Sequence, residues 1–353
     1  MEQSLKPSLK QTVNEQFLAE RFPELWKHLS PSEVTDVDYN CGNLWISTTD
    51  KVTEKIEDSS ITESYMRNVA KTIGICTGKS FNATDNLLCV DTDTLRVTCV
   101  HESVSNNSVS ACLRKEIAGL RFTMEQAIAE GFCDENTFHL LINCVLAGFN
   151  FTFCGVPGTG KTEILKHLSS YIPGHEKVIT IEDVGEIHYS KINPNHNCIE
   201  LKVGLTSYEE CITNALRMNP SWIIFGEALG KNTQHLLECW SNGVATMSTL
   251  HVSDARNIPD KIVNDLGLKQ DTERVMNQVH NDVGIAVLLK KKITNDQQIK
   301  RYIDQICFYF RQEGINGKAL VLENGTFYPG RIPSFVRAKI EKDLGRTLCS
   351  SPF

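Results

Sequence analysis

An octapeptide with the pattern GxxxxGK[ST], residues 155–162, has the most clearly defined chemistry of any segment in this sequence. Its glycines let the backbone approach phosphate groups and adopt positive φ, so that the loop amides form a cradle for an anion. We expect Lys161 to reach the β- and γ-phosphates and the Thr162 hydroxyl to bind magnesium. The pattern predicts a nucleotide-binding loop whose phosphate-contacting residues are Gly155, Gly158, Thr159, Gly160, Lys161 and Thr162.

A glutamate at the end of an apolar run, Glu227, is the candidate base for hydrolysis of a bound nucleotide. Hydrolysis needs a carboxylate that activates water, placed at the tip of a strand next to the loop. Residues 222–225 are apolar and are followed by Gly226 and Glu227, which lies 66 residues after Lys161. That interval leaves room for an adjacent strand. A single glutamate after an apolar run is more often a solvated loop residue, so the assignment depends on the other polar residues at strand ends.

Two further apolar runs also lead into polar side chains. Residues 178–181 precede Glu182, with Glu186 close behind, and residues 246–250 precede His251. Ligands of parallel α/β sheets bind at the carboxyl ends of the strands. Glu182 and Glu186 are therefore candidates to hold the magnesium shell or the attacking water, and His251 is a candidate to sense the γ-phosphate. Each residue alone is more often structural, and the prediction rests on their occurring together.

The spacing of apolar residues predicts the elements that position these side chains. From residue 149 onward apolar strands alternate with helices, which indicates a mainly parallel sheet covered on both faces. Upstream, residues 34–113 contain short strands and one amphipathic helix. The sequence thus predicts an α/β protein with a small N-terminal α+β domain over residues 1–116, a linker over 117–136 and a P-loop NTPase domain over 137–353.

The composition is that of an ordinary globular protein. Of the 353 residues, 41% are hydrophobic and 22% are charged, and the net charge of -7 gives no electrostatic footprint for nucleic acid. We expect no direct nucleic-acid binding. No signal-like N-terminal segment and no run of roughly 18 apolar residues occurs, so a cytoplasmic protein is expected. Thirteen scattered cysteines without a CxxC pair indicate reduced thiols.

These segments, in this order, resemble the motifs of the secretion ATPase superfamily that includes VirB11, PilT and the type II secretion motors. The Walker A loop is residues 155–162, and Gly226 before Glu227 is a common feature of the family's Walker B region. The N-terminal segment 37–46 is similar to the opening of VirB11 N-terminal domains, and the likeness extends over about residues 33–310. The other motifs of the resemblance are the Asp box, 180–186, the Walker B region, 216–227, and the His box, 248–251.

The resemblance implies a RecA-like ATPase domain with mostly parallel sheet that binds ATP and Mg²⁺. It implies a homohexameric motor that powers substrate transport or pilus assembly in a type IV secretion or conjugation system. Its partners would be secretion or pilus assembly components of the inner membrane, and its location would be peripheral to the inner face of the cell membrane. The arginines that reach the nucleotide from the family's N-terminal domain correspond to Arg96 and Arg114, with Arg121 as a weaker third candidate.

Several departures from the family pattern mark a divergent member, among them the P-loop residues 156–159, Val-Pro-Gly-Thr, where Gly-Thr-Gly-Ser is commoner. Leu229 replaces the arginine of the GExR motif, Ser221 replaces a frequent aspartate, and Val244 replaces a histidine. Alternatives therefore stay open: a pilus-retraction or type II secretion ATPase, or a nucleotide-regulated scaffold with little turnover. An AAA+ ATPase is less favoured, because that class expects Asp-Glu at the end of its Walker B strand.

Overall fold

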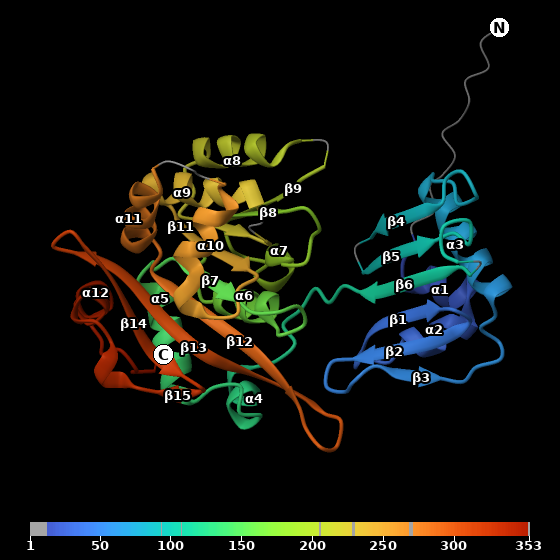
Figure 1. Ribbon diagram of the computed structural model, residues 1–353, viewed down its shortest axis with the longest axis horizontal. Helices are drawn as coiled ribbons and strands as arrows, with labels where there is room; N and C mark the ends of the chain where they lie inside the picture. Colours follow the sequence, from blue (N-terminus) through green and yellow to red (C-terminus); the bar gives the residue numbers. More distant parts are fainter. Residues whose placement is uncertain are drawn as a thin grey trace, which may run out of the picture. The chain divides into compact units, whose positions relative to one another are not determined.

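The computed structural model describes residues 13–92, 94–106, 108–204, 206–227, 230–267 and 271–351. The chain divides into two compact units (Figure 1). The first unit comprises the residues up to Ile117 together with Ile293–Ile299. The second comprises Ala118–Lys292 and the residues from Lys300 onward.

The first unit is built on an antiparallel sheet with the strand order β3-β2-β1-β6-β5-β4. Helix α3, Glu63–Thr77, begins with the Thr62 side chain accepting from a backbone amide and ends at Gly78 in the left-handed conformation. Its Met66, Val69, Ala70 and Ile73 recur at helical spacing and are buried in the core of the unit. The other elements are α1 Glu15–Arg21, α2 Pro23–Leu29, β1 Val34–Asn40, β2 Asn43–Thr48, β3 Glu54–Ile56, β4 Leu87–Asp91, β5 Leu95–Val100 and β6 Ser110–Lys115.

The second unit is built on a sheet with the strand order β15-β14-β13-β12-β7-β11-β10-β8-β9. The pairs from β12 through β9 are parallel, whereas β13, β14 and β15 are joined by antiparallel pairing. The strands are β7 Phe151–Cys154, β8 Val178–Glu182, β9 Cys198–Lys202, β10 Trp222–Phe225, β11 Ala245–Leu250, β12 Ile285–Ile293, β13 Ile299–Gln312, β14 Ile315–Glu323 and β15 Thr326–Phe327.

Helices cover both faces of this sheet, because its central strands are apolar on both sides. Along β10, Trp222 and Ile224 pack into one core, whereas Ile223 and Phe225 pack into the core on the opposite face. The α helices are α4 Met124–Ala129, α5 Glu135–Leu146, α6 Lys161–Ser169, α7 Tyr189–Ile192, α8 Tyr208–Arg217, α9 Thr233–Ser241, α10 Ile258–Asp265, α11 Thr272–Asp282 and α12 Ser334–Leu344.

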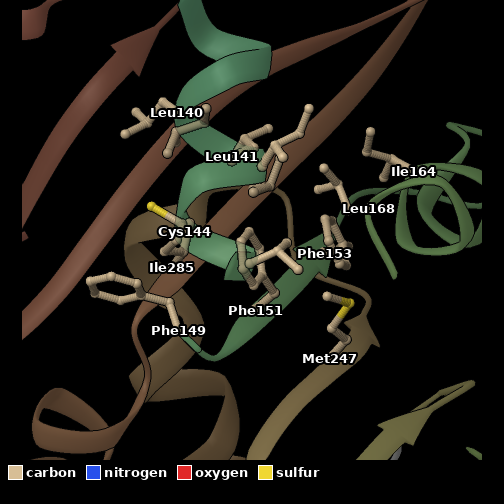
Figure 2. Packing of buried hydrophobic residues seen from close by; sticks show 14 of the residues in the cluster. Leu140, Leu141, Cys144, Phe149, Phe151, Phe153, Ile164, Leu168, Met247 and Ile285 are labelled. Atoms are coloured by element: carbon tan, nitrogen blue, oxygen red, sulfur yellow. The ribbon is translucent and has the colours of Figure 1, made fainter. Parts of the chain in front are cut away.

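One of these cores fixes the strand that leads into the P-loop. Phe151 and Phe153 of β7 pack with Leu140 and Leu141 of α5 and with Leu168 of α6 (Figure 2). All of these side chains are fully buried. The end of β7 and the start of α6 are thereby held on a rigid base. The largely parallel sheet, covered by helices on both faces, confirms the predicted α/β class.

The boundaries of the units differ from the sequence expectation in two places. Nearly all of the predicted linker 117–136 belongs to the second unit, and its Ala127 and Phe132 are buried in the core of that unit. Residues Ile293–Ile299, expected in the ATPase domain, belong to the first unit, where Lys51 forms a β-bridge with Gln298. Both differences arise from contacts between residues far apart in sequence. Within the part of the chain that the structure describes, no helix has the length and apolar character needed to span a bilayer.

Candidate functional site

The P-loop connects β7 to α6 and has the backbone conformation that its glycines permit. Gly155, Gly158 and Gly160 have φ of 142°, 76° and 93°. A Cβ atom on Gly155 would lie 2.5 Å from the carbonyl oxygen of Leu289 and 2.9 Å from Oγ1 of Thr159. Only glycine fits at that position. The predicted loop therefore lies between a buried strand and a helix N-terminus, which is the arrangement that binds phosphate.

Lys161, the first residue of α6, folds over the loop. Its Nζ donates to the carbonyl oxygens of Gly155, at 3.0 Å, and Val156, at 3.3 Å. The side chain is buried, and burial lowers the pKa of its ammonium group, an effect that the nearby Glu227 carboxylate opposes. Oγ1 of Thr159 also donates to Val156, at 2.9 Å. The Lys161 ammonium group is thus hydrogen-bonded to the loop carbonyls, close to where the phosphates of a nucleotide would lie.

Glu227 and His251 form a contacting pair beside this loop. Nε2 of His251 lies 2.5 Å from Oε1 of Glu227, and Nδ1 lies 3.2 Å from the carbonyl oxygen of Gly155. The two side chains are 40% and 38% exposed, so water reaches both of them. The pair connects the acid that follows β10 to the first residue of the P-loop.

Glu182, the last residue of β8, is a buried carboxyl group. Its Oε1 accepts from the backbone amides of Glu186 and Ile187, both at 3.1 Å. Burial raises the pKa of Glu182 to about 8, although the two amide hydrogen bonds oppose that shift. A Cβ atom on Gly226 would lie 3.1 Å from Cγ and Oε1 of Glu182. The glycine before Glu227 therefore makes the space that the Glu182 side chain occupies.

The strand order brings most of the predicted site residues to one edge of the sheet. Strands β7, β11, β10 and β8 are parallel neighbours, and each carries one motif at its carboxyl end. The charges of Glu227 and Glu186 both raise the pKa of Lys161, so these acids lie within electrostatic range of the loop lysine. Thr162 follows Lys161 in the first turn of α6. One candidate site thus contains the P-loop together with Glu182, Glu186, Glu227 and His251.

Arg96 and Arg114 lie in the first unit, on β5 and β6, where they are direct cross-strand partners. Nε of Arg114 donates to Oδ1 of Asp36 at 2.6 Å. Arg96 lies 3.4 Å from both Asp91 and Glu116. The two arginines form one basic row on the sheet of the first unit, flanked by carboxylates.

Arg121 and Leu229 are two further positions that the sequence analysis singled out. Arg121 lies in the second unit, where its Nε is 3.3 Å from Oε1 of Glu163 in the first turn of α6. This contact makes it a neighbour of the P-loop helix. Leu229, which replaces the family's arginine, lies outside the described residues.

The structure adds two basic residues to the site that the sequence motifs did not single out. Lys291 of β12 donates from Nζ to the carbonyl oxygen of Pro157 at 3.3 Å. Arg301 of β13 donates from Nε to the carbonyl oxygen of Gly158 at 2.9 Å. The only sequence signal for them is the basic character of residues 290–292 and 300–301.

Comparisons with known proteins show the family and the fold of the chain. Residues 95–326 match the sequence profile of the family described as type II/IV secretion system protein. An uncharacterised protein of Bacillus anthracis is 26% identical over 307 residues, which make up 81% of this chain and 69% of that protein. VirB11 of Agrobacterium tumefaciens is 32% identical over 135 residues, 36% of this chain and 38% of VirB11. The fold is similar to that of the Legionella pneumophila ATPase DotB, with a TM-score of 0.62 and 15% identity over 88% of this chain and 84% of DotB.

Proposed function

The chain belongs to the type II/IV secretion system protein family, of which it is a divergent VirB11-like member, and we propose that it is an ATPase that powers a type IV secretion or conjugation system. The observation that carries this proposal is the contact of Glu227 with His251, which in turn contacts Gly155 of the P-loop. An acid and a phosphate cradle linked in this way fit the hydrolysis of a nucleoside triphosphate.

In the proposed reaction the P-loop amides and Lys161 bind the β- and γ-phosphates of ATP. Lys161 exchanges its present carbonyl partners for phosphate oxygens, which are stronger acceptors for an ammonium group. Glu227 accepts the proton of the attacking water, and His251 reports the state of the γ-phosphate. The exposure of both side chains allows water to reach the reacting position.

Mg²⁺ fits the oxygen-rich end of this site. Thr162 lies in the first turn of α6, the Glu182 carboxyl group lies beside Gly226, and the Glu186 carboxylate lies within electrostatic range of Lys161. Hard oxygen donors of this kind suit magnesium, which would neutralise charge on the β- and γ-phosphates when bound. We assign Thr162 as its protein ligand and Glu182 and Glu186 to its shell or to the attacking water.

The assembly proposed for the chain is a homohexameric ring in which the two units are the N-terminal and ATPase domains. Arg96 and Arg114, adjacent on β5 and β6, are the proposed nucleotide-contacting arginines of the N-terminal domain. The proposed partners are inner-membrane components of the secretion or pilus assembly apparatus. The proposed location is therefore the cytoplasm, peripheral to the inner face of the membrane.

The test combines light scattering with and without MgATP and a phosphate-release assay on wild type and Glu227→Gln. We expect six subunits, slow turnover in the wild type, and a loss of about 100-fold or more in the variant with ATP binding retained. Equal, negligible turnover in both proteins with intact ATP binding would favour the nucleotide-regulated scaffold instead. A permanent monomer that binds no ATP would refute the proposal.

A further inference from the structure

Two cations, Lys291 on β12 and Arg301 on β13, hold the backbone of the P-loop from outside the motif. Nζ of Lys291 lies 3.3 Å from the carbonyl oxygen of Pro157, and Nε of Arg301 lies 2.9 Å from that of Gly158. A Cβ atom on Gly158 would lie 3.0 Å from Nζ of Lys291. The two side chains thus contact successive peptide groups of the P-loop.

From this arrangement we propose that Lys291 and Arg301 are positioning residues of the P-loop, which orient its amides toward the phosphates of ATP. The proposal rests on the proposed function. A trans peptide is planar, with its C=O and N–H pointing in opposite directions. When Lys291 and Arg301 bind the carbonyls of Pro157 and Gly158, the amides of Gly158 and Thr159 point away from the two cations and into the cradle.

The loop needs such an anchor because its glycines can adopt several backbone conformations and do not by themselves hold one of them. Gly158 and Gly160 have positive φ, and glycine populates many other backbone states at little cost. Inside the loop, Thr159 donates to Val156, but no such internal bond among the described contacts fixes the carbonyls of Pro157 and Gly158. Charged donors form stronger hydrogen bonds than neutral ones, so two cations are effective anchors for those carbonyls.

The neighbouring Lys290 and Lys292 contact other groups, unlike Lys291 and Arg301, which contact the P-loop. Lys290 forms an ion pair with the buried Asp304 at 2.8 Å, and Nζ of Lys292 lies 5.8 Å from the ring centroid of Tyr302. Successive side chains of a strand point to opposite faces. Lys291 and Arg301 are therefore the members of this basic cluster that face the loop, and Lys300 serves as a matched exposed control on the same strand.

The experiment measures the affinity of the full chain for MgATP by titration calorimetry in Arg301→Met, Lys291→Met and the control Lys300→Met. Each loop-facing variant is expected to weaken ATP binding by about tenfold, the effect of losing one charge-assisted hydrogen bond, and the control by less than about twofold. In the ATPase assay, KM is expected to rise more than kcat falls. Arg301→Lys should recover part of the affinity, since a lysine still donates to Gly158.

A second measurement needs no nucleotide. Amide hydrogen exchange across residues 155–162 should be faster in Arg301→Met and Lys291→Met than in Lys300→Met, because the freed peptides fluctuate. Unchanged exchange and ATP affinity equal to that of the control would overturn the inference. If the wild type itself bound no ATP, the proposed function would fail, and the exchange result would still decide whether the two cations hold the loop.

Discussion

Nε2 of His251 lies 2.5 Å from Oε1 of Glu227, while Nδ1 of the same ring lies 3.2 Å from the carbonyl oxygen of Gly155. A carbonyl oxygen only accepts, so Nδ1 carries a hydrogen. The contact with Glu227 needs one more proton, located either on Nε2 or on the carboxyl group. The acid proposed to activate water thus shares a proton with a ring whose other side contacts the P-loop.

We predict that His251→Asn lowers kcat for ATP hydrolysis by about 10- to 100-fold, because the substitution removes the shared proton and the link to the loop. Affinity for ATP should change little, since the phosphates are bound by the P-loop amides and Lys161. Phosphate release and calorimetry measure the two effects. His175→Asn, at an exposed histidine, is the control. Turnover equal to that of the control would exclude a role for His251 in the reaction.

Glu182 should make the stability of the protein depend on pH. Its pKa is raised from 4.5 to about 8 in the folded protein, chiefly by burial, so between these values the folded state holds a proton that the unfolded state releases. The free energy of unfolding therefore falls as pH rises through this window, by at most about 1.4 kcal/mol per pH unit from this group. Chemical denaturation at a series of pH values measures the slope.

The variant Glu182→Gln should remove this component of the slope and raise stability at pH 8 relative to the wild type. A glutamine keeps the carbonyl oxygen that accepts from the amides of Glu186 and Ile187, and it carries no charge to desolvate. Glu209→Gln, at an exposed glutamate in the first turn of α8, should leave the slope unchanged. Identical slopes in wild type and Glu182→Gln would show that Glu182 is ionised in the folded protein.

Gly226→Ala tests whether the glycine before Glu227 makes room for Glu182. The added Cβ would lie 3.1 Å from Cγ and Oε1 of Glu182, whose side chain is buried and has little freedom to move. We expect a loss of about 1–3 kcal/mol in the free energy of unfolding and a lower kcat, since both acids shift. Gly185→Ala is the control, because nothing lies within 4 Å of its added Cβ. Equal stability of the two variants would contradict the packing argument.

The sequence predicts those parts of the fold that local patterns determine. The P-loop octapeptide combines its glycines with Lys161 in a single segment, and fully apolar runs such as β7 and β10 are typical of strands buried on both faces. Because parallel strands place their carboxyl ends at one edge, the proximity of Glu227, His251 and the loop also follows from the pattern.

Contacts between distant segments could not be predicted in this way. Lys291 and Arg301 reach the P-loop because β12 pairs with β7, although the paired residues are more than 130 positions apart in sequence. Residues 293–299 lie inside the range expected for the ATPase domain, yet Lys51 forms a bridge with Gln298 in the first unit. Helix α12 buries Val336 and Ile340 in a core of the second unit, with residues that are far from it in the sequence.

The last prediction separates the role of Lys161 in binding from its role in the fold. Lys161→Met should weaken ATP binding by about 100-fold or more, because the ammonium group that pairs with the phosphates is lost. Without nucleotide its free energy of unfolding should stay within about 1 kcal/mol of the wild type, since methionine fills a similar volume and needs no desolvation of a charge. Calorimetry with MgATP and urea denaturation measure the two quantities on the same preparations. Unaltered affinity for ATP would remove the P-loop from the proposed mechanism, whereas a large loss of stability would assign the lysine to holding Gly155 and Val156 in place.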